Sequence, residues 1–295
     1  MLSILIPVYN YAVLPLISEL QKQCISCGIK FEILCYDDAS NLFIKENQEV
    51  NQLKYCAFIS LEKNIGRSAI RNLLAEKANF QNLLFLDADV IPAHNQFIEN
   101  YISEINKNEK VVFGGLLYEN QKPSKELLLR WIYGKEREAL SLSERSKNHS
   151  DFALVSNLLI KKEILIHFPF DETLTKYGYE DLLFFSVLKS NQIKIKHIEN
   201  PVFHLNLESS SVFLSKTKIS LENLAFLNRT NKISVNESRI IASFELLKKV
   251  KALTVFNFIF RKIESKIERN LISETPSLFW FDIYKLGYFS SLKSK

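Results

Sequence analysis

Four short apolar runs alternate with segments of helical length in the first 90 residues, and this alternation constrains the fold more than any other feature. The runs cover 2–8, 31–36, 55–61 and 82–86. Runs of this length without polar alternation are typical of strands that are buried on both faces of a sheet. Segments 14–27 and 68–78, which lie between them, have helical length and apolar spacing. The pattern predicts an α/β fold, a doubly wound and mostly parallel sheet with flanking helices.

Polar residues follow each of these runs at the point where the strand should end. They are Tyr9 and Asn10, then Asp37 and Asp38, then Asn64, Gly66 and Arg67, and finally Asp87 and Asp89. A single acidic pair at such a position can be an ordinary helix cap. Parallel sheets bind ligands beyond the carboxyl ends of their strands, so four polar strand ends in succession predict one binding site.

Beyond these strands the pattern is less regular and finally helical. We expect a helix over 95–106, strands over 111–117 and 152–160, a helix over 161–167, a helix that opens at Glu180 and Asp181, and a strand over 193–199, after which the segment 201–205 closes this part of the chain. From 211 onward the spacing is helical throughout. The sequence therefore predicts an α/β domain over 1–210 and a helical extension over 211–295.

Charge is distributed unevenly along the chain. Residues 211–295 contain 15 Lys and Arg against 7 Asp and Glu, whereas residues 1–210 contain 23 against 26. Segments 254–270 and 277–293 combine apolar residues with Lys and Arg at helical spacing, which is typical of helices lying on an anionic membrane. Packing onto the rest of the protein or onto a second subunit is the alternative, because aromatic stripes usually mark cores. No nucleic-acid-binding motif accompanies the charge, so we expect no nucleic-acid partner.

Two features bear on location and redox state. No apolar stretch approaches the roughly 18 residues that a spanning helix needs, and the first residues lack the basic region of a signal peptide. We therefore expect a cytoplasmic protein that can contact the inner face of the cell membrane peripherally through 254–295. Four cysteines are too few for a disulfide framework. Cys24 and Cys27 form a lone C-x-x-C, which we interpret as core or surface thiols rather than a redox or zinc pair.

Asp87 and Asp89 are candidate metal ligands. They lie two residues apart at a strand end, so their carboxylates point the same way in an extended segment. Such oxygens suit a hard divalent cation, although solvated acids at strand ends are common. His204 follows another predicted strand, and a nitrogen ligand favours Mn²⁺ over Mg²⁺. A packed or surface imidazole is the alternative for this histidine.

The motifs IPVYN, YDDAS, NIGRSAIRN, LDADV and YGYEDLLF, followed by His204, occur in an order that resembles the inverting family 2 glycosyltransferases of GT-A fold. The resemblance covers residues 1–207 and points to the bacterial enzymes that make polysaccharides and glycolipids. It implies a Rossmann-like GT-A domain with a nucleotide-binding half (1–90) and an acceptor-binding half (91–210), followed by the helical extension. It also implies transfer of a sugar from a nucleotide-sugar, with UDP-sugars first among donors, to a glycan or lipid-linked acceptor. Mn²⁺ or Mg²⁺ would be the cofactor.

The resemblance implies a role for each motif on the donor side. The nucleotide-sugar site would consist of Pro7, Tyr9, Asn10, Asp38, Asn64, Gly66, Arg71 and Asp87. Asp38 would line the pocket of the base, Arg71 would face the ribose or diphosphate, and Asp87 would contact ribose or sugar hydroxyls. Asp89 would ligate the cation that bridges the diphosphate, and His204 would add a further ligand. The chain has no glycine-rich phosphate loop, which favours a metal-held diphosphate.

Asp181 is the predicted general base, by resemblance to the aspartate of a Gly-x-Glu-Asp stretch at a helix start. The acceptor hydroxyl must lose its proton as it attacks, and a helix N-terminus favours the ionised carboxylate. One such displacement would invert the anomeric centre. A capping role for Glu180 and Asp181 is the alternative. Glu180, Tyr179 and Trp131 are predicted to contact the acceptor, although many relatives carry Trp-Gly-Gly where this chain has YGY.

Two further aromatic residues, Tyr118 and Tyr133, fall on the expected acceptor side with Trp131. They can stack on a saccharide or pack in the core, and one sequence does not separate the two.

Two other functions remain open at this level. A nucleotidyltransferase that forms sugar nucleotides also uses an α/β sheet and a carboxylate-bound metal, but it usually needs a glycine-rich N-terminal loop that IPVYNYAVLP does not provide. A catalytically inactive module that binds sugar nucleotides or glycans is the second alternative. The sequence pattern does not identify the donor sugar, the acceptor, the linkage or the oligomeric state. Specificity depends on the shape of the pocket, which a sequence pattern does not determine.

Overall fold

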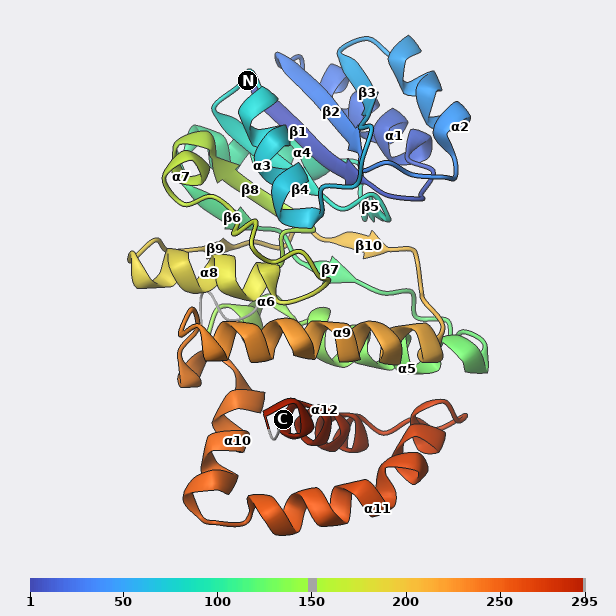
Figure 1. The fold of residues 1–295 in the computed structure, drawn as a ribbon. Helices are drawn as coiled ribbons and strands as arrows, with labels where there is room; N and C mark the ends of the chain where they lie inside the picture. The colour runs from blue at the N-terminus through green and yellow to red at the C-terminus, as the bar shows by residue number, and fades with distance from the viewer. Residues whose placement is uncertain (148–152, 294–295) are drawn as a thin grey trace. The chain divides into compact units, whose positions relative to one another are not determined.

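The computed structural model describes residues 1–147 and 153–293 and divides the chain into two compact units (Figure 1). The first unit contains residues 1–119, 138–175 and 187–206, and the second contains 120–137, 176–186 and 207–295. The second unit thus joins the predicted helical extension to two segments that we expected in the α/β domain. A domain boundary at residue 210 stays a prediction.

The main sheet of the first unit has seven strands in the order β3-β2-β1-β4-β8-β6-β9. The strands are β1 (Leu2–Val8), β2 (Phe31–Asp37), β3 (Cys56–Ser60), β4 (Asn82–Leu86), β6 (Val111–Phe113), β8 (Asn157–Lys161) and β9 (Lys196–His197). Strands β1 to β4 pair in parallel, β8 runs antiparallel to β4 and β6, and β9 runs parallel to β6. The four predicted N-terminal strands and the mostly parallel sheet are therefore confirmed.

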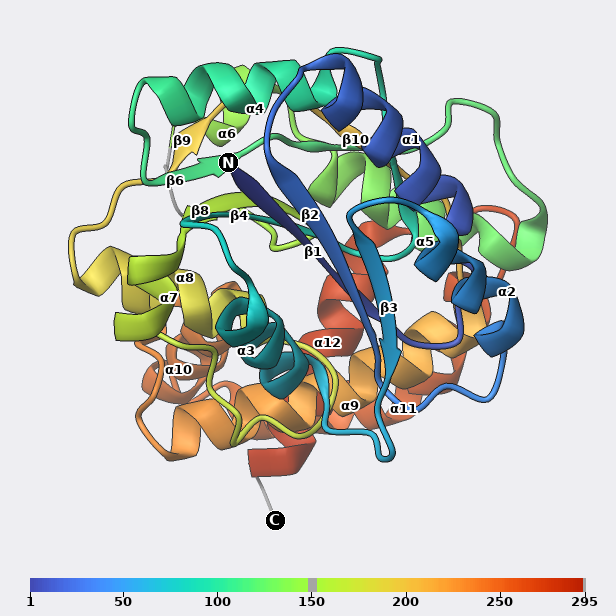
Figure 2. The ribbon, with the colours of Figure 1, turned by 90° about the horizontal axis from the view of Figure 1, so that it is seen from above.

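Helices cover both faces of this sheet, as Figure 2 shows from above. Helices α1 (Leu14–Ser26) and α4 (Phe97–Asn106) lie on one face, and α3 (Arg67–Lys77) and α7 (Lys162–His167) lie on the other. Helix α1 begins with a proline in its first turn, where the missing N–H costs nothing. Its buried side includes Cys24, and all four cysteines are free thiols. This burial agrees with the core interpretation of Cys24.

The predicted strand over 111–117 is broken at Gly114 and Gly115, and this break is a correction with a physical cause. A Cβ on Gly114 would lie 2.4 Å from the backbone oxygen of Asn200 and 2.5 Å from the hydroxyl of Tyr101, so only glycine lets the chains approach this closely. After the break, β7 (Leu116–Leu117) leaves the main sheet. It joins β5 (Val90–Pro92) and β10 (Val202–His204) in a second sheet of order β5-β10-β7.

The other expected elements are present with shifted bounds. The strand expected over 152–160 is β8, which begins at Asn157; position 152 lies outside the described residues. The strand expected over 193–199 is limited to β9. Helix α8 (Glu180–Ser190) begins at Glu180, as predicted. The remaining short elements are α2 (Ile44–Gln48), η1 (Glu49–Gln52), η2 (Lys125–Leu127), α5 (Leu128–Tyr133), η3 (Gly134–Glu138), α6 (Leu142–Arg145) and η4 (Val235–Glu237).

Long helices dominate the second unit. They are α9 (Ser210–Arg229), α10 (Arg239–Lys249), α11 (Leu253–Leu271) and α12 (Leu278–Lys293). Helix α12 packs against both α9 and α11, and its Phe281 and Tyr284 are buried in the shared core. Tyr133 of α5 packs edge-on against Phe281, so the core interpretation holds for this tyrosine. Among the described residues, no helix is both long enough and apolar enough to cross a membrane.

Candidate functional site

Asp38 ties together the loops that follow β2 and β3. Its two carboxylate oxygens accept hydrogen bonds from the backbone N–H groups of Ile65, at 2.6 Å, and Gly66, at 3.0 Å. The side-chain amide of Asn64 donates to the backbone oxygen of Asp38 at 3.0 Å. Burial raises the pKa of Asp38, and the two backbone donors partly oppose that rise. Three residues that the sequence predicted at the donor site, Asp38, Asn64 and Gly66, therefore form one hydrogen-bonded cluster.

The loops after β1 and β2 are linked in a similar way. The amide oxygen of Asn10 accepts hydrogen bonds from the N–H groups of Asn41, at 2.8 Å, and Leu42, at 3.1 Å. Asp37 is fully buried and accepts from the backbone and hydroxyl of Ser40, so its role is to fix the loop. Tyr9 projects from this framework with 55% of its surface exposed. An exposed ring on a fixed loop can lie against a flat ligand.

Arg71 is buried, and its guanidinium contacts Asp87. The side chain is 2% exposed, and one of its nitrogens lies 3.3 Å from a carboxylate oxygen of Asp87. The guanidinium also lies over the ring of Phe170, 5.4 Å from its centre. Asp87 keeps 26% of its side chain exposed. Arg71 thus holds Asp87 in place, while Asp87 itself can reach a ligand.

The second sheet brings Asp89 and His204 together. Strands β5 and β10 pair antiparallel, and the backbone oxygen of Asp89 accepts a hydrogen bond from Leu205 at 2.9 Å. As a result, the Nε2 atom of His204 lies 3.6 Å from a carboxylate oxygen of Asp89. Burial and the nearby Asp87 raise the pKa of Asp89, while His204 and Arg67 oppose the rise. A carboxylate that is partly desolvated in this way favours binding of a positive charge.

Asp89 and His204 are the residues that could hold a cation. A carboxylate oxygen and an imidazole nitrogen at this separation form a mixed donor set that suits Mn²⁺. Within residues 1–147 and 153–293, no three His, Cys, Asp or Glu side chains are grouped as a metal site.

Sequence reasoning missed several neighbours of this pair. The ring of Tyr118 stacks on the ring of His204 with centres 5.2 Å apart and planes at 20°, and its hydroxyl donates to Glu138. Tyr11 and Arg67 lie close enough to Asp89 for their charges to interact with it. Arg67 is exposed, and its one signal in the sequence was its position in the NIGR motif after the third strand, which did not relate it to Asp89. No signal in the sequence relates Tyr118 to His204, because the contact depends on the break at Gly114 and Gly115.

The predicted base and acceptor residues lie in the second unit. Gly178 and Tyr179 both have positive φ, and the side chain of Asn223 donates to the backbone oxygen of Gly178 at 2.9 Å. Glu180 is buried in the first turn of α8, and Asp181, beside it, is half-buried. Burial raises the pKa of Tyr179. The loop before α8 is therefore built to a fixed shape.

Trp131 lies in α5 of the same unit and is half-buried, with the ammonium of Lys135 over its ring at 5.0 Å. The roles of Trp131, Tyr179, Glu180 and Asp181 toward an acceptor stay predictions.

Comparisons with known proteins give a consistent result. The family described as Glycosyl transferase family 2 matches residues 3–168. No curated protein sequence is similar enough to the chain to count as a relative.

Solved structures share the fold. The structure of S. aureus TarS 1–349 in complex with UDP is 19% identical, covers all of this chain and 92% of its own, and has a TM-score of 0.51. The complex of the same protein with UDP-GlcNAc is 17% identical with equal coverage and TM-score. GalNAc-T7 with UDP, GalNAc and Mn²⁺ is 18% identical, covers 70% of this chain and 43% of its own, and has a TM-score of 0.55. The longer structure of S. aureus TarS is covered over only 40% of its length.

Proposed function

The chain belongs to glycosyl transferase family 2, and we propose that it is a metal-dependent, inverting enzyme that transfers a sugar from a UDP-sugar to a saccharide or lipid-linked saccharide. The observation that supports the proposal most directly is the pairing of β5 with β10, which brings Asp89 and His204 to 3.6 Å from each other beside Asp87. Membership in the family leaves the nucleotidyltransferase alternative without support. Turnover of a nucleotide-sugar would distinguish an active transferase from an inactive binding module.

On the donor side, the residues of the first unit bind and orient. Tyr9 offers its exposed ring to the base, and Asp38 holds the loop after β3 through Ile65 and Gly66. Asp87, fixed by Arg71, is available to ribose or sugar hydroxyls. The UDP complexes of the two structural neighbours support testing UDP-sugars first.

Asp89 and His204 would hold the cation. A bound divalent ion would neutralise charge that develops on the diphosphate as it leaves. Arg67 is exposed and near Asp89, so we assign to it the interaction with the diphosphate that the resemblance implied for Arg71. A buried arginine that already contacts Asp87 is less suited to that task.

On the acceptor side, Asp181 accepts the proton of the attacking hydroxyl. The acceptor oxygen forms a bond to the anomeric carbon, the bond from that carbon to the diphosphate oxygen breaks, and the electron pair leaves with the diphosphate. One displacement of this kind inverts the centre. The position of Asp181 in the first turn of α8 favours its ionised form.

A lipid-linked acceptor would bring the enzyme to a membrane, and the proposal includes peripheral contact through part of 254–295.

The test is release of nucleoside diphosphate from UDP-, GDP- and TDP-sugars with Mn²⁺, with Mg²⁺ and with EDTA. We expect release from a UDP-sugar that requires metal and is lost in Asp89→Ala. Glu46→Ala removes the same charge from the exposed surface of α2 and should keep full activity. Asp181→Asn should lower kcat by about 10²- to 10⁴-fold while donor binding is retained.

Three results would contradict parts of the proposal. Release that EDTA does not affect would exclude the metal role. A product with the donor's anomeric configuration would exclude inversion, and UDP-sugar binding without turnover in the presence of a broad acceptor panel would favour the inactive module.

A further inference from the structure

The outward face of α11 is apolar in its first turns and cationic in its last turns. Val255, Phe258 and Ile259 are 61%, 60% and 50% exposed, which is unusual for large apolar side chains on one helix. Lys262, Lys266 and Arg269 are exposed as well. At 100° per residue these six positions fall within one arc of the helix. The ammonium of Lys262 lies over the ring of Phe258 at 4.4 Å, which places the two kinds of residue together on this face.

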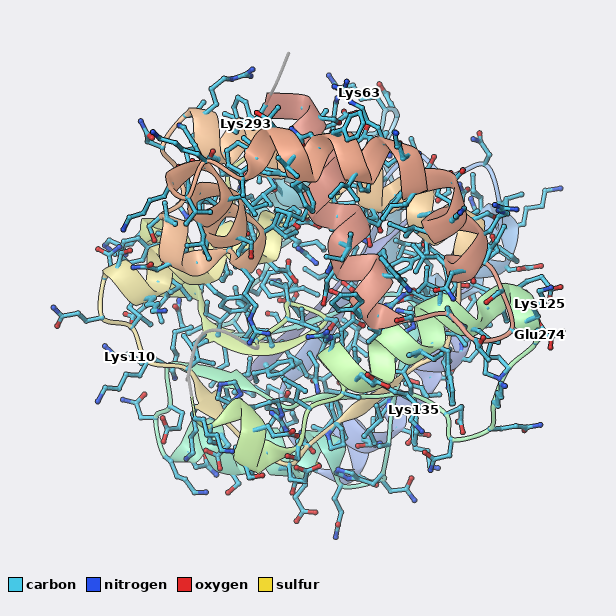
Figure 3. The ribbon with its side chains drawn as sticks, turned by 90° about the horizontal axis from the view of Figure 1, so that it is seen from below. Lys63, Lys110, Lys125, Lys135, Glu274 and Lys293 are labelled. Carbon is cyan, nitrogen blue, oxygen red and sulfur yellow. The ribbon has the colours of Figure 1, made fainter. Side chains whose placement is uncertain are left out.

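The opposite face of α11 belongs to the core of the second unit. Phe260, Ile267 and Leu271 are buried in one cluster with residues of α9 and α12. Helix α12 packs against both α9 and α11, so α11 is covered on its α12 side. Figure 3 looks onto the side on which α11 lies and shows its side chains. The exposed arc is therefore an outer surface of this unit, and its apolar residues are not part of its core.

The acidic residues of α11 are kept off this surface. Glu268 is engaged within the unit, where it contacts the ammonium of Lys218 at 3.1 Å and accepts a hydrogen bond from Tyr284 at 2.8 Å, although 39% of its side chain stays exposed. Glu264 is only partly exposed and lies on the same side of the helix as Glu268. From residue 246 to residue 273 no exposed position is acidic. The exposed charged positions of α11 are therefore all basic, and they lie beside exposed apolar residues and the neutral Thr254 and Ser265.

The end of α10 continues this composition. Leu246 and Val250 are about as exposed as Val255, and Lys248, Lys249 and Lys251 are exposed beside them. These residues directly precede α11 in the chain. Exposed apolar and basic residues are therefore concentrated in one continuous stretch of the second unit.

We propose that the outward face of α11 binds the surface of an anionic lipid bilayer. Apolar side chains that enter the acyl boundary and Lys or Arg side chains that meet anionic headgroups are the two contributions that hold an interfacial helix. Val255, Phe258 and Ile259 supply the first, and Lys262, Lys266 and Arg269 supply the second. Charge complementarity favours an anionic bilayer over an uncharged one.

The structure narrows the surface that the sequence indicated. Segment 277–293 resembles 254–270 in composition, but α12 buries Phe281, Tyr284 and Phe289, so these side chains cannot face lipid. Its start exposes Phe279 and Trp280, yet the nearby exposed charge is Asp282, whereas the Lys285 side chain is only 16% exposed. The contact is thus assigned to α11 rather than to all of 254–295. This inference deepens the proposed function, because it locates the enzyme where a lipid-linked acceptor would be found, but binding to lipid requires neither donor nor turnover.

The test is co-sedimentation of the full chain with vesicles of phosphatidylcholine alone and with 30% phosphatidylglycerol. We expect binding to the anionic vesicles that weakens at 0.5 M NaCl, because salt screens exposed charges. Each cation near the bilayer contributes about fivefold in affinity, so the triple variant Lys262→Gln/Lys266→Gln/Arg269→Gln should bind about 100-fold more weakly. Phe258→Ser should weaken binding about tenfold by removing apolar contact.

A matched control removes three exposed lysines from the first unit, as Lys22→Gln/Lys30→Gln/Lys45→Gln. This variant should bind anionic vesicles nearly as well as the wild type. The proposal is overturned if the full chain does not sediment with anionic vesicles, or if both triple variants lose binding equally. It is also overturned if sedimentation velocity shows a dimer that Phe258→Ser abolishes while no vesicle binding occurs. Release of nucleoside diphosphate, measured on the same samples without vesicles, tests the transferase assignment separately.

Discussion

Asp38→Ala should separate the structural role of Asp38 from its role in donor binding. The carboxylate accepts two backbone hydrogen bonds, from Ile65 at 2.6 Å and Gly66 at 3.0 Å. A hydrogen bond to a charged group contributes about 1.5–3 kcal/mol, so the upper bound for losing both is about 3–6 kcal/mol. Ile65 and Gly66 are half-buried, so water can replace part of the loss, and removal of a desolvated carboxylate offsets more. We expect a net destabilisation of about 2 kcal/mol, or about 5 °C in Tm.

Glu32→Ala is the matched control, because Glu32 makes the same kind of contact near the other end of β2. Its carboxylate accepts from the hydroxyl of Ser3 at 2.6 Å and from the backbone and side chain of Asn79 at 2.6 and 2.7 Å. Its removal should lower Tm by a similar amount. The two variants therefore match in stability and differ in their distance from the proposed donor site.

The assay is thermal unfolding with and without UDP. At a UDP concentration of about 100 Kd, the wild type should gain about 2.7 kcal/mol of stability. Glu32→Ala should show the same gain, whereas Asp38→Ala should show little or none. An unchanged Tm for Asp38→Ala without ligand would refute the contact reasoning. A full UDP-induced gain in Asp38→Ala would refute the prediction that Asp38 lines the pocket of the nucleotide base.

Three further predictions test the site. Burial raises the folded-state pKa of Asp38 above its ordinary value of 3.8, so the folded state binds this proton more tightly. The contribution to stability therefore grows as pH falls through the folded pKa toward 3.8, and the difference in unfolding free energy between wild type and Asp38→Asn should be larger at pH 4 than at pH 8 in urea titrations; a constant difference would exclude the shift. Gly178→Ala should lower stability by about 1–3 kcal/mol and reduce kcat, because φ is +96° and the new Cβ would lie 2.4 Å from Cβ of Ser220, while UDP affinity stays unchanged by calorimetry. Tyr118→Ala should weaken Mn²⁺ binding about tenfold by freeing the His204 ring, Tyr118→Phe should retain more of it, and equal metal affinity in all three proteins by calorimetry would remove the positioning role.

The sequence by itself determined the framework of β1 to β4 and the loops that follow these strands. Continuous apolar runs require strands buried on both faces, and strands of that kind pair in parallel with their carboxyl ends at one edge. The polar residues that follow β1 to β4 were therefore predictable as neighbours, and the contacts of Asp38 with Ile65 and Gly66 bear this out. Glu180 and Asp181 at a helix start were likewise predictable, because helix starts have local signals.

Only the tertiary structure decided what lies around Asp89 and on α11. His204 reaches Asp89 because β10 pairs with β5, and Tyr118 reaches His204 because close packing around Gly114 diverts the chain into the second sheet. Pairing between segments more than 100 residues apart has no local pattern, since it depends on which edges meet. In the same way, segments 254–270 and 277–293 have like compositions, and packing alone placed Phe281, Tyr284 and Phe289 of α12 in the core and left one face of α11 exposed.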